Sequence, residues 1–144
     1  MRRPGRSRAV VAATAVAALL ALTGCSTAGE QVRDYVSENY ERVSDNGPYA
    51  AFRSDDSVDK IAEDIQAAAA PGRDHQDTTG RYLGYEDVMV HIEEEQNGSG
   101  SAIEVTDARD GYDRWGPAII PIWGTFGGSY RNAFSGGGSG FGGK

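Results

Sequence analysis

The chain has 144 residues, with 21 aspartates and glutamates against 14 lysines and arginines and a formal net charge of −7. This length allows one small domain, and the acidic balance excludes the basic footprint that nucleic-acid binding requires. The single cysteine excludes an intrachain disulfide, which often stabilises small exported domains.

The first 25 residues have the three parts of a secretory signal. A basic start precedes an apolar run over residues 9–22. The run is too short to span a bilayer comfortably, because a helix needs about 20 residues to cross ~30 Å of hydrocarbon. It closes on a four-residue motif: Leu22, Thr23, Gly24 and Cys25.

This segment resembles the bacterial lipoprotein signal peptide, whose lipobox is Leu-[Ala/Ser/Thr/Val]-[Gly/Ala]-Cys. The resemblance implies that a lipid carrying fatty acids such as palmitate is attached to the thiol of Cys25 and that residues 1–24 are removed. Their removal takes four of the 14 basic residues and no acidic one, so the net charge becomes −11. Anionic headgroups would repel such a domain, and a two-chain lipid on Cys25 supplies a stable hold on the membrane.

The first half of the remaining chain predicts two helices and a strand. Residues 25–29 are small and are expected to form a tether. A first helix is predicted from one apolar face, made by Val32, Tyr35, Val36, Tyr40 and Val43. Residues 45–48, Asp-Asn-Gly-Pro, are expected to end it. Residues 49–53 are consistent with a short strand.

A second helix is predicted from a second apolar stripe, made by Val58, Ile61, Ala62, Ile65 and Ala69. Asp56 and Asp59 resemble a capping box at its start, and Pro71-Gly72 ends it. Residues 73–80 are polar and are expected to form a loop.

The next part of the chain predicts strands over residues 81–85, 88–93 and 102–107. In the second of these Val88, Val90 and Ile92 alternate with polar or larger residues, a period of two. Asn97-Gly98 predicts the hairpin that follows. The expected class is α+β, with two helices packed on a small antiparallel sheet in the order α-β-α-β-β-β.

The C-terminal part has a different composition. Residues 114–144 carry three basic residues and no acidic one, and ten glycines lie between Gly116 and Lys144. From Thr125 onward we expect a disordered tail rich in glycine and aromatic residues, so the single domain spans residues 30–124. Residues 118–123 are too apolar for such a tail and are expected to form a last strand, to dock on the domain or to bind a partner.

Two serine motifs invite a catalytic interpretation that their context does not support. Ser57-Val58-Asp59-Lys60 and Ser44-Asp45-Asn46 match two motifs of the penicillin-recognising serine enzymes. Their order is reversed, however, and the third motif, Lys-Thr-Gly, is absent. We interpret the two segments as a helix cap and a turn.

The histidines and the last acidic segment are the other candidate site residues. His75 and His91 have no serine or cysteine partner at a recognisable spacing, and His91 is expected to be solvated on the face opposite to Val88 and Val90. Residues 107–113 place three aspartates around Gly111, an oxygen-rich segment that suits calcium but lacks the EF-hand spacing. The alternative is a turn whose aspartates bond their own backbone.

The segment after the signal resembles a family of small bacterial lipoproteins of unknown function, common in actinobacteria and also seen in bacilli. The resemblance covers most of residues 30–144. It is carried by short motifs: Asp34-Tyr35-Val36 with Tyr40, Tyr49 to Ser54, Gly80-Arg81-Tyr82-Leu83 with Tyr85, Asp87-Val88, and Gly111-Tyr112 with Arg114-Trp115. It implies a similar anchored fold, no established activity and no catalytic residue to carry over.

These observations lead us to expect an exported, non-catalytic accessory or binding module of a Gram-positive envelope, without a cofactor. Its expected place is the outer face of the cytoplasmic membrane, held by the lipid on Cys25, with an envelope protein or the cell wall as partner. One alternative is a small hydrolase or metal-dependent enzyme that uses His75, His91 and residues 107–113. A second alternative is an envelope protein that binds calcium or another cation through its acidic domain.

Overall fold

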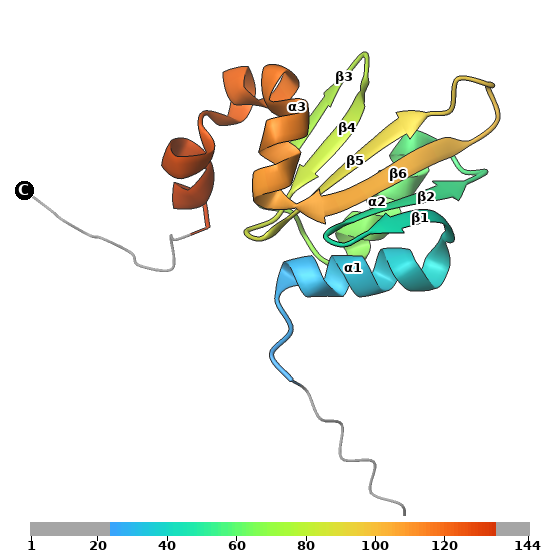
Figure 1. Ribbon diagram of the computed structural model, residues 1–144, viewed down its shortest axis with the longest axis horizontal. Helices are drawn as coiled ribbons and strands as arrows, with labels where there is room; N and C mark the ends of the chain where they lie inside the picture. Colours follow the sequence, from blue (N-terminus) through green and yellow to red (C-terminus); the bar gives the residue numbers. More distant parts are fainter. Residues whose placement is uncertain (1–23, 135–144) are drawn as a thin grey trace, which may run out of the picture.

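The computed structural model describes residues 24–134, in which an antiparallel sheet of six strands is packed between two layers of helix (Figure 1). The strand order in the sheet is β1-β2-β6-β5-β4-β3. The strands are β1 (Glu41–Asn46), β2 (Tyr49–Ser54), β3 (Arg73–Asp77), β4 (Gly80–Gly84), β5 (Val88–Glu94) and β6 (Ser101–Asp107). The expected α+β class, with helices on an antiparallel sheet, is confirmed.

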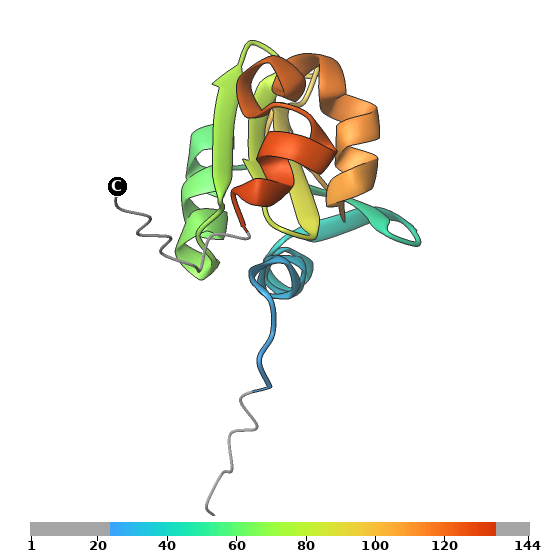
Figure 2. The same cartoon turned by 90° about the vertical axis from the view of Figure 1, so that its left-hand side faces the viewer.

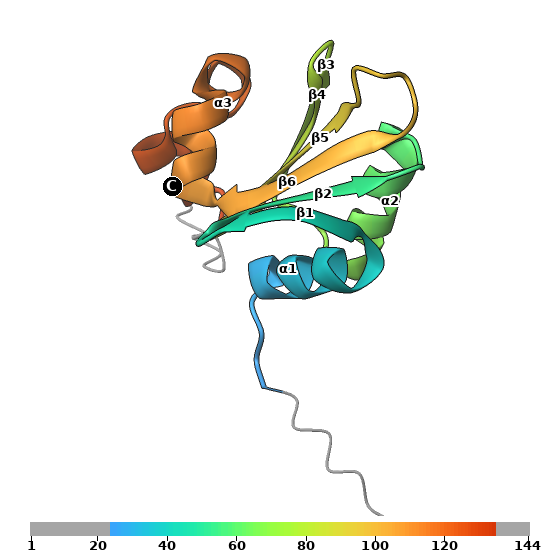
Figure 3. The same ribbon diagram turned by 45° about the vertical axis from the view of Figure 1, so that its right-hand side comes forward.

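Two helices cover each face of the sheet (Figure 3). On one face lie α1 (Ala28–Asn39) and α2 (Val58–Ala68), and on the other lie α3 (Ala108–Trp123) and a π-helical turn, η1 (Phe126–Tyr130). In the described part of the chain, none of the helices combines the length and hydropathy that crossing a bilayer requires.

The core under α1 and α2 follows the predicted apolar stripes. Ile61 and Ile65 of α2 are fully buried and pack with Leu83, Val90 and Ile103, which point to this face from three neighbouring strands. The second helix is therefore confirmed. Its N-cap is Ser57, whose hydroxyl accepts a hydrogen bond from the backbone N–H of Lys60, and not Asp56.

The first helix is shorter than predicted. It ends at Asn39, and the residues expected to complete it form β1, an edge strand in which Val43 is 62 % exposed. The dipeptide Asn46-Gly47 makes the β1–β2 hairpin and does not end a helix. Gly47 has a φ of 67°, which suits glycine, so the dipeptide was a hairpin signal like Asn97-Gly98.

Residues 73–80 were expected to form a loop and instead supply β3 and its turn into β4. In β3, His75 lies opposite Tyr82 and Asp74 lies opposite Leu83. Every side chain of β3 is polar, as suits the short edge strand of a sheet. Because β3 contains no apolar residue, the alternation of apolar and polar residues that usually predicts a strand is absent from it.

The acidic segment 107–113 is not a loop, because α3 begins at Ala108 and continues to Trp123. Residues 118–123 are the last turns of this helix and not a strand. Ile119 and Trp123 are buried against the sheet, whereas Ile120 and Ile122 are exposed. The segment therefore docks on the domain through one face only.

The prediction of a disordered tail from Thr125 is wrong for residues 125–134, which are packed on the domain. Tyr130 of η1 is fully buried, and its hydroxyl donates to the backbone carbonyl of Tyr85. Gly84 makes this possible, because a Cβ there would lie 2.8 Å from the Tyr130 hydroxyl. Figure 2 shows the red segment on the same side of the sheet as α3. Residues 135–144 lie outside the described residues.

We expect Tyr130→Ala to lower the free energy of unfolding by about 3–5 kcal/mol, because it empties the centre of an aromatic cluster. Tyr130→Phe keeps the ring and removes only one hydrogen bond, so it should cost about 1 kcal/mol. Urea denaturation measures both values. Unchanged midpoints in both variants would show that this segment does not stabilise the domain.

Candidate functional site

A row of polar and aromatic side chains crosses the sheet on the face covered by α3. The strand register places His75, Tyr82, His91 and Glu104 opposite one another on four adjacent strands. Tyr82 stacks on His91 with ring centroids 4.5 Å apart, and His75 stacks on the other side of Tyr82 at 6.2 Å. The sheet therefore brings together two histidines that are 16 positions apart in sequence.

Glu104, at the β6 end of this row, accepts two hydrogen bonds and joins Tyr49 of β2 to the row. The Tyr49 hydroxyl lies 2.7 Å from its Oε1, and Nδ1 of His91 lies 3.0 Å from its Oε2. The hydrogen bonds from His91 and Tyr49 lower the pKa of Glu104 against the opposing effect of its burial. Burial and the hydrogen bond to Glu104 raise the pKa of Tyr49 to about 12.

The ionised carboxylate of Glu104 determines which ring nitrogen of a neutral His91 carries the proton. An ionised carboxylate only accepts hydrogen bonds, so the proton of a neutral His91 lies on Nδ1. Its Nε2 is then an acceptor, and this atom is buried without a hydrogen-bond partner among residues 24–134. The pair has the orientation of a carboxylate–histidine base. Among the described residues, no hydroxyl lies within hydrogen-bond distance of Nε2 to be activated.

The expectation that His91 is solvated is wrong. It lies on the predicted face of β5, but only 4 % of the residue is exposed, because Trp115 of α3 covers it at a centroid distance of 5.2 Å. The period of two correctly predicted the face. The burial of His91 could not be predicted in the same way, because it depends on α3, and the sequence analysis does not predict a helix over residues 108–123.

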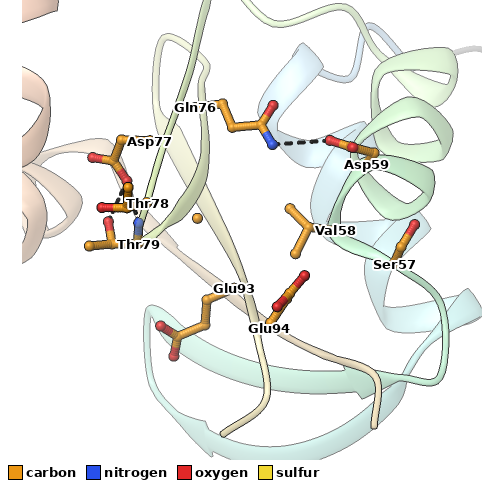
Figure 4. Close-up of a pocket in the computed structure, with 10 residues that line it drawn as sticks. Ser57, Val58, Asp59, Gln76, Asp77, Thr78, Thr79, Glu93 and Glu94 are labelled. Carbon is orange, nitrogen blue, oxygen red and sulfur yellow. Dashed lines mark hydrogen bonds between the residues drawn. The ribbon is translucent and has the colours of Figure 1, made fainter. Parts of the chain in front are cut away.

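A separate polar notch of about 450 Å³ lies at one end of the sheet (Figure 4). It lies between the start of α2, the β3–β4 turn and the end of β5. Asp59 accepts a hydrogen bond from Gln76 across it, and Asp77 accepts two from Thr79. The acidic groups Glu93 and Glu94 line its other side.

The serine motif at the edge of this notch is structural. The Ser57 hydroxyl caps α2, and the ammonium group of Lys60 pairs with Asp64 one turn along the helix instead of approaching Ser57. The interpretation of Ser57-Val58-Asp59-Lys60 as a helix cap is confirmed. In the other motif, Asp45 pairs with Arg42 within the β1–β2 hairpin.

The aspartates of residues 107–113 do not converge. Asp107 pairs with Arg33 of α1 at 2.6 Å, and Asp113 lies 3.9 Å from Arg109 on the surface of α3. Across residues 24–134, no three histidine, cysteine, aspartate or glutamate side chains group closely enough to hold a metal ion.

The motif proposed for lipid attachment lies where the described chain begins. Gly24 and Cys25 are exposed, and Leu22 and Thr23 lie outside the described residues. The expected tether of residues 25–29 is shorter, because α1 already begins at Ala28. Thr27 and Glu30 cap this helix reciprocally, each side chain accepting from the other's backbone N–H.

Glu104→Gln should change how the stability of the fold depends on pH. Because the pKa of Glu104 is lowered by folding, its carboxylate stabilises the protein above the ordinary glutamate pKa, and this contribution is lost as the pH falls through the lowered pKa. The variant should lose about 1–3 kcal/mol at neutral pH and should show a shallower acid limb in melts from pH 7 to about pH 3. The exposed Glu94→Gln is the control, and an acid limb equal to that of wild type in Glu104→Gln would contradict the network.

Comparisons with curated proteins and with solved structures found no match for this chain. A comparison with protein-family models found one described as a domain of unknown function (DUF4247), which matches residues 18–144. The match includes every helix and strand of the fold and the whole row from Tyr49 to Glu104. The chain therefore belongs to the DUF4247 family, a family of unknown function.

Proposed function

We propose that this protein is an exported lipoprotein of a Gram-positive envelope, whose domain is a non-catalytic module that binds an envelope protein or a cell-wall partner. Residues 1–24 act as its signal peptide. A lipid on Cys25 holds it at the outer face of the cytoplasmic membrane.

The position of Cys25 relative to the fold carries the anchoring part of this proposal. The sheet and both cores consist of residues that follow Cys25, so a cut before it would remove none of them. The cysteine is exposed, and only Ser26 and Thr27 separate it from α1. Two extended residues reach about 7 Å, so an anchored domain would lie directly on the membrane surface.

The same geometry suggests which surface would face a partner. In the three ribbon views α1 begins at one end of the domain, and α3 runs from the sheet toward the opposite end (Figures 1–3). Ile120 and Ile122, on its last turns, are 43 % and 59 % exposed. Residues 115–130 contain no charged side chain, which is unusual for a chain of this acidity. An exposed apolar, uncharged surface held away from the membrane favours a protein partner.

Cys25→Ser should abolish lipid attachment and leave an uncleaved precursor, because the resembled signal is cut only after the thiol is modified. Metabolic labelling with a fatty-acid analogue in the producing cells measures this. Thr27→Ala, two residues away, is the control and should remain labelled, since it removes a helix cap and a hydrogen bond to Asp87 but leaves the thiol in place. Equal labelling of wild type and Cys25→Ser would refute the anchor.

A photoreactive residue at position 122 should crosslink to one discrete partner on intact cells, and the adduct should disappear when Ile120→Asp is added. The matched control is the same probe at position 43, because Val43 is equally exposed but lies on the edge strand β1. Crosslinks of the same mass and yield from both positions would show that the end of α3 is not a binding surface.

A further inference from the structure

We infer that a pocket between the β1–β2 turn and the first two turns of α3 binds a small zwitterion, such as a free amino acid or a short peptide, through its ammonium and carboxylate groups. The pocket has a volume of about 390 Å³. Its lining includes Asn46, Tyr49, Thr106, Asp110, Asp113 and Arg114. Figures 1 and 3 show the β1–β2 turn beside the beginning of α3. This inference is independent of the lipid anchor and of the exposed end of α3.

The first observation is a buried hydroxyl with nothing to bind. Thr106 lines the pocket from β6 and is fully buried, and its Oγ1 has no hydrogen-bond partner among the described residues. Buried polar groups are nearly always satisfied, because an unpaired one destabilises the fold. Because Oγ1 lies just beneath the pocket surface, a ligand would provide this partner when the lining side chains shift to admit it.

The second observation is that Arg114 forms no ion pair with Asp110, one turn earlier on α3. Asp110 and Arg114 are four residues apart on α3, a spacing at which such pairs usually form. Neither takes part in an ion pair within residues 24–134. The guanidinium group of Arg114 instead lies over the ring of Tyr49, 4.2 Å from its centroid.

This stacking leaves Arg114 able to bind a carboxylate. A cation–π contact uses the face of the guanidinium group, and the N–H groups that hold a carboxylate in two parallel hydrogen bonds lie in its plane. The ring beneath it is itself held, because the Tyr49 hydroxyl donates to Glu104. The cation is therefore presented on a fixed platform.

The charges of the lining select the class of ligand. A simple anion at Arg114 would face the carboxylates of Asp110 and Asp113, and a simple cation at these aspartates would face Arg114. A molecule with one ammonium and one carboxylate group satisfies both signs at once. The Thr106 hydroxyl and the Asn46 amide would form hydrogen bonds with the neutral part of the ligand, between its two charged groups.

The experiment uses the full chain in detergent, with alanylalanine and alanine as the two zwitterionic probes and NMR amide shifts as the readout. At least one probe should bind saturably and shift the amides of residues 46–49, 106 and 110–114; the tighter of the two identifies the ligand as a peptide or an amino acid. N-acetylalanine and alaninamide, which carry only one of the two charges, should each bind at least tenfold more weakly, the loss expected for one charged hydrogen bond. No saturable shifts with either zwitterion, or equal binding of a single-charge analogue, would overturn the inference.

Variants distinguish this pocket from nonspecific binding. Arg114→Gln and Asp110→Asn should each weaken binding about tenfold. Arg53→Gln is the control for the loss of a positive charge, because Arg53 pairs with Glu95 and neither residue lines the pocket. Equal affinities for wild type and Arg114→Gln would refute the assignment.

Thr106→Val gives a second, independent test, because it removes the unpaired hydroxyl at constant shape. If the hydroxyl serves a ligand, the variant should melt at a higher temperature without ligand and should bind the zwitterion more weakly. A variant that binds as tightly as wild type would show that Thr106 has no part in the site.

Discussion

Burial of both faces of β5 is the constraint on which the rest of the structure depends. Five consecutive residues of this strand, from Val88 to Ile92, are buried, so neither face can be left to solvent. Val90 and Ile92 belong to the core under α1 and α2, and Met89 belongs to the core under α3. A domain of this size can cover both faces only by using almost its whole length, which is why residues 125–134 pack instead of trailing away.

The two faces differed in how far the sequence could predict them. The stripe from Val58 to Ala69 and the alternation in β5 are uninterrupted, so the core under α1 and α2 could be anticipated. The other cover, α3, contains Pro117 and Pro121, which oppose a helix by local propensity. Tertiary packing overrides that propensity. The visible signal was the helical spacing of its sheet-facing side chains: Ala108, Tyr112, Trp115, Ile119 and Trp123.

The burial of the candidate site also depends on α3, which the sequence analysis does not predict. The period of two places His91 on the correct face, but the alternation within β5 carries no information about α3, which covers that face. The link of His91 to Glu104 could not be read from the chain, because strand pairing and not sequence spacing brings the two residues together. Arg114 of α3 and Thr106 of β6 line one pocket, and this relation too cannot be predicted from their spacing in the sequence. In this fold, chemistry lies where the sheet meets the helix that was hardest to predict.

The place of β6 in the sheet has a consequence for the order of folding. Although β6 is the last strand in sequence, it lies between β2 and β5 and joins the N-terminal hairpin to the remaining strands. Until β6 is available, the β1–β2 hairpin has no third strand, and an isolated two-stranded hairpin is only marginally stable. Pairing β2 with β6 also closes a loop of more than 45 residues, which slows folding. The topology therefore keeps the N-terminal half from forming a lasting sheet until nearly the whole domain has emerged from the ribosome.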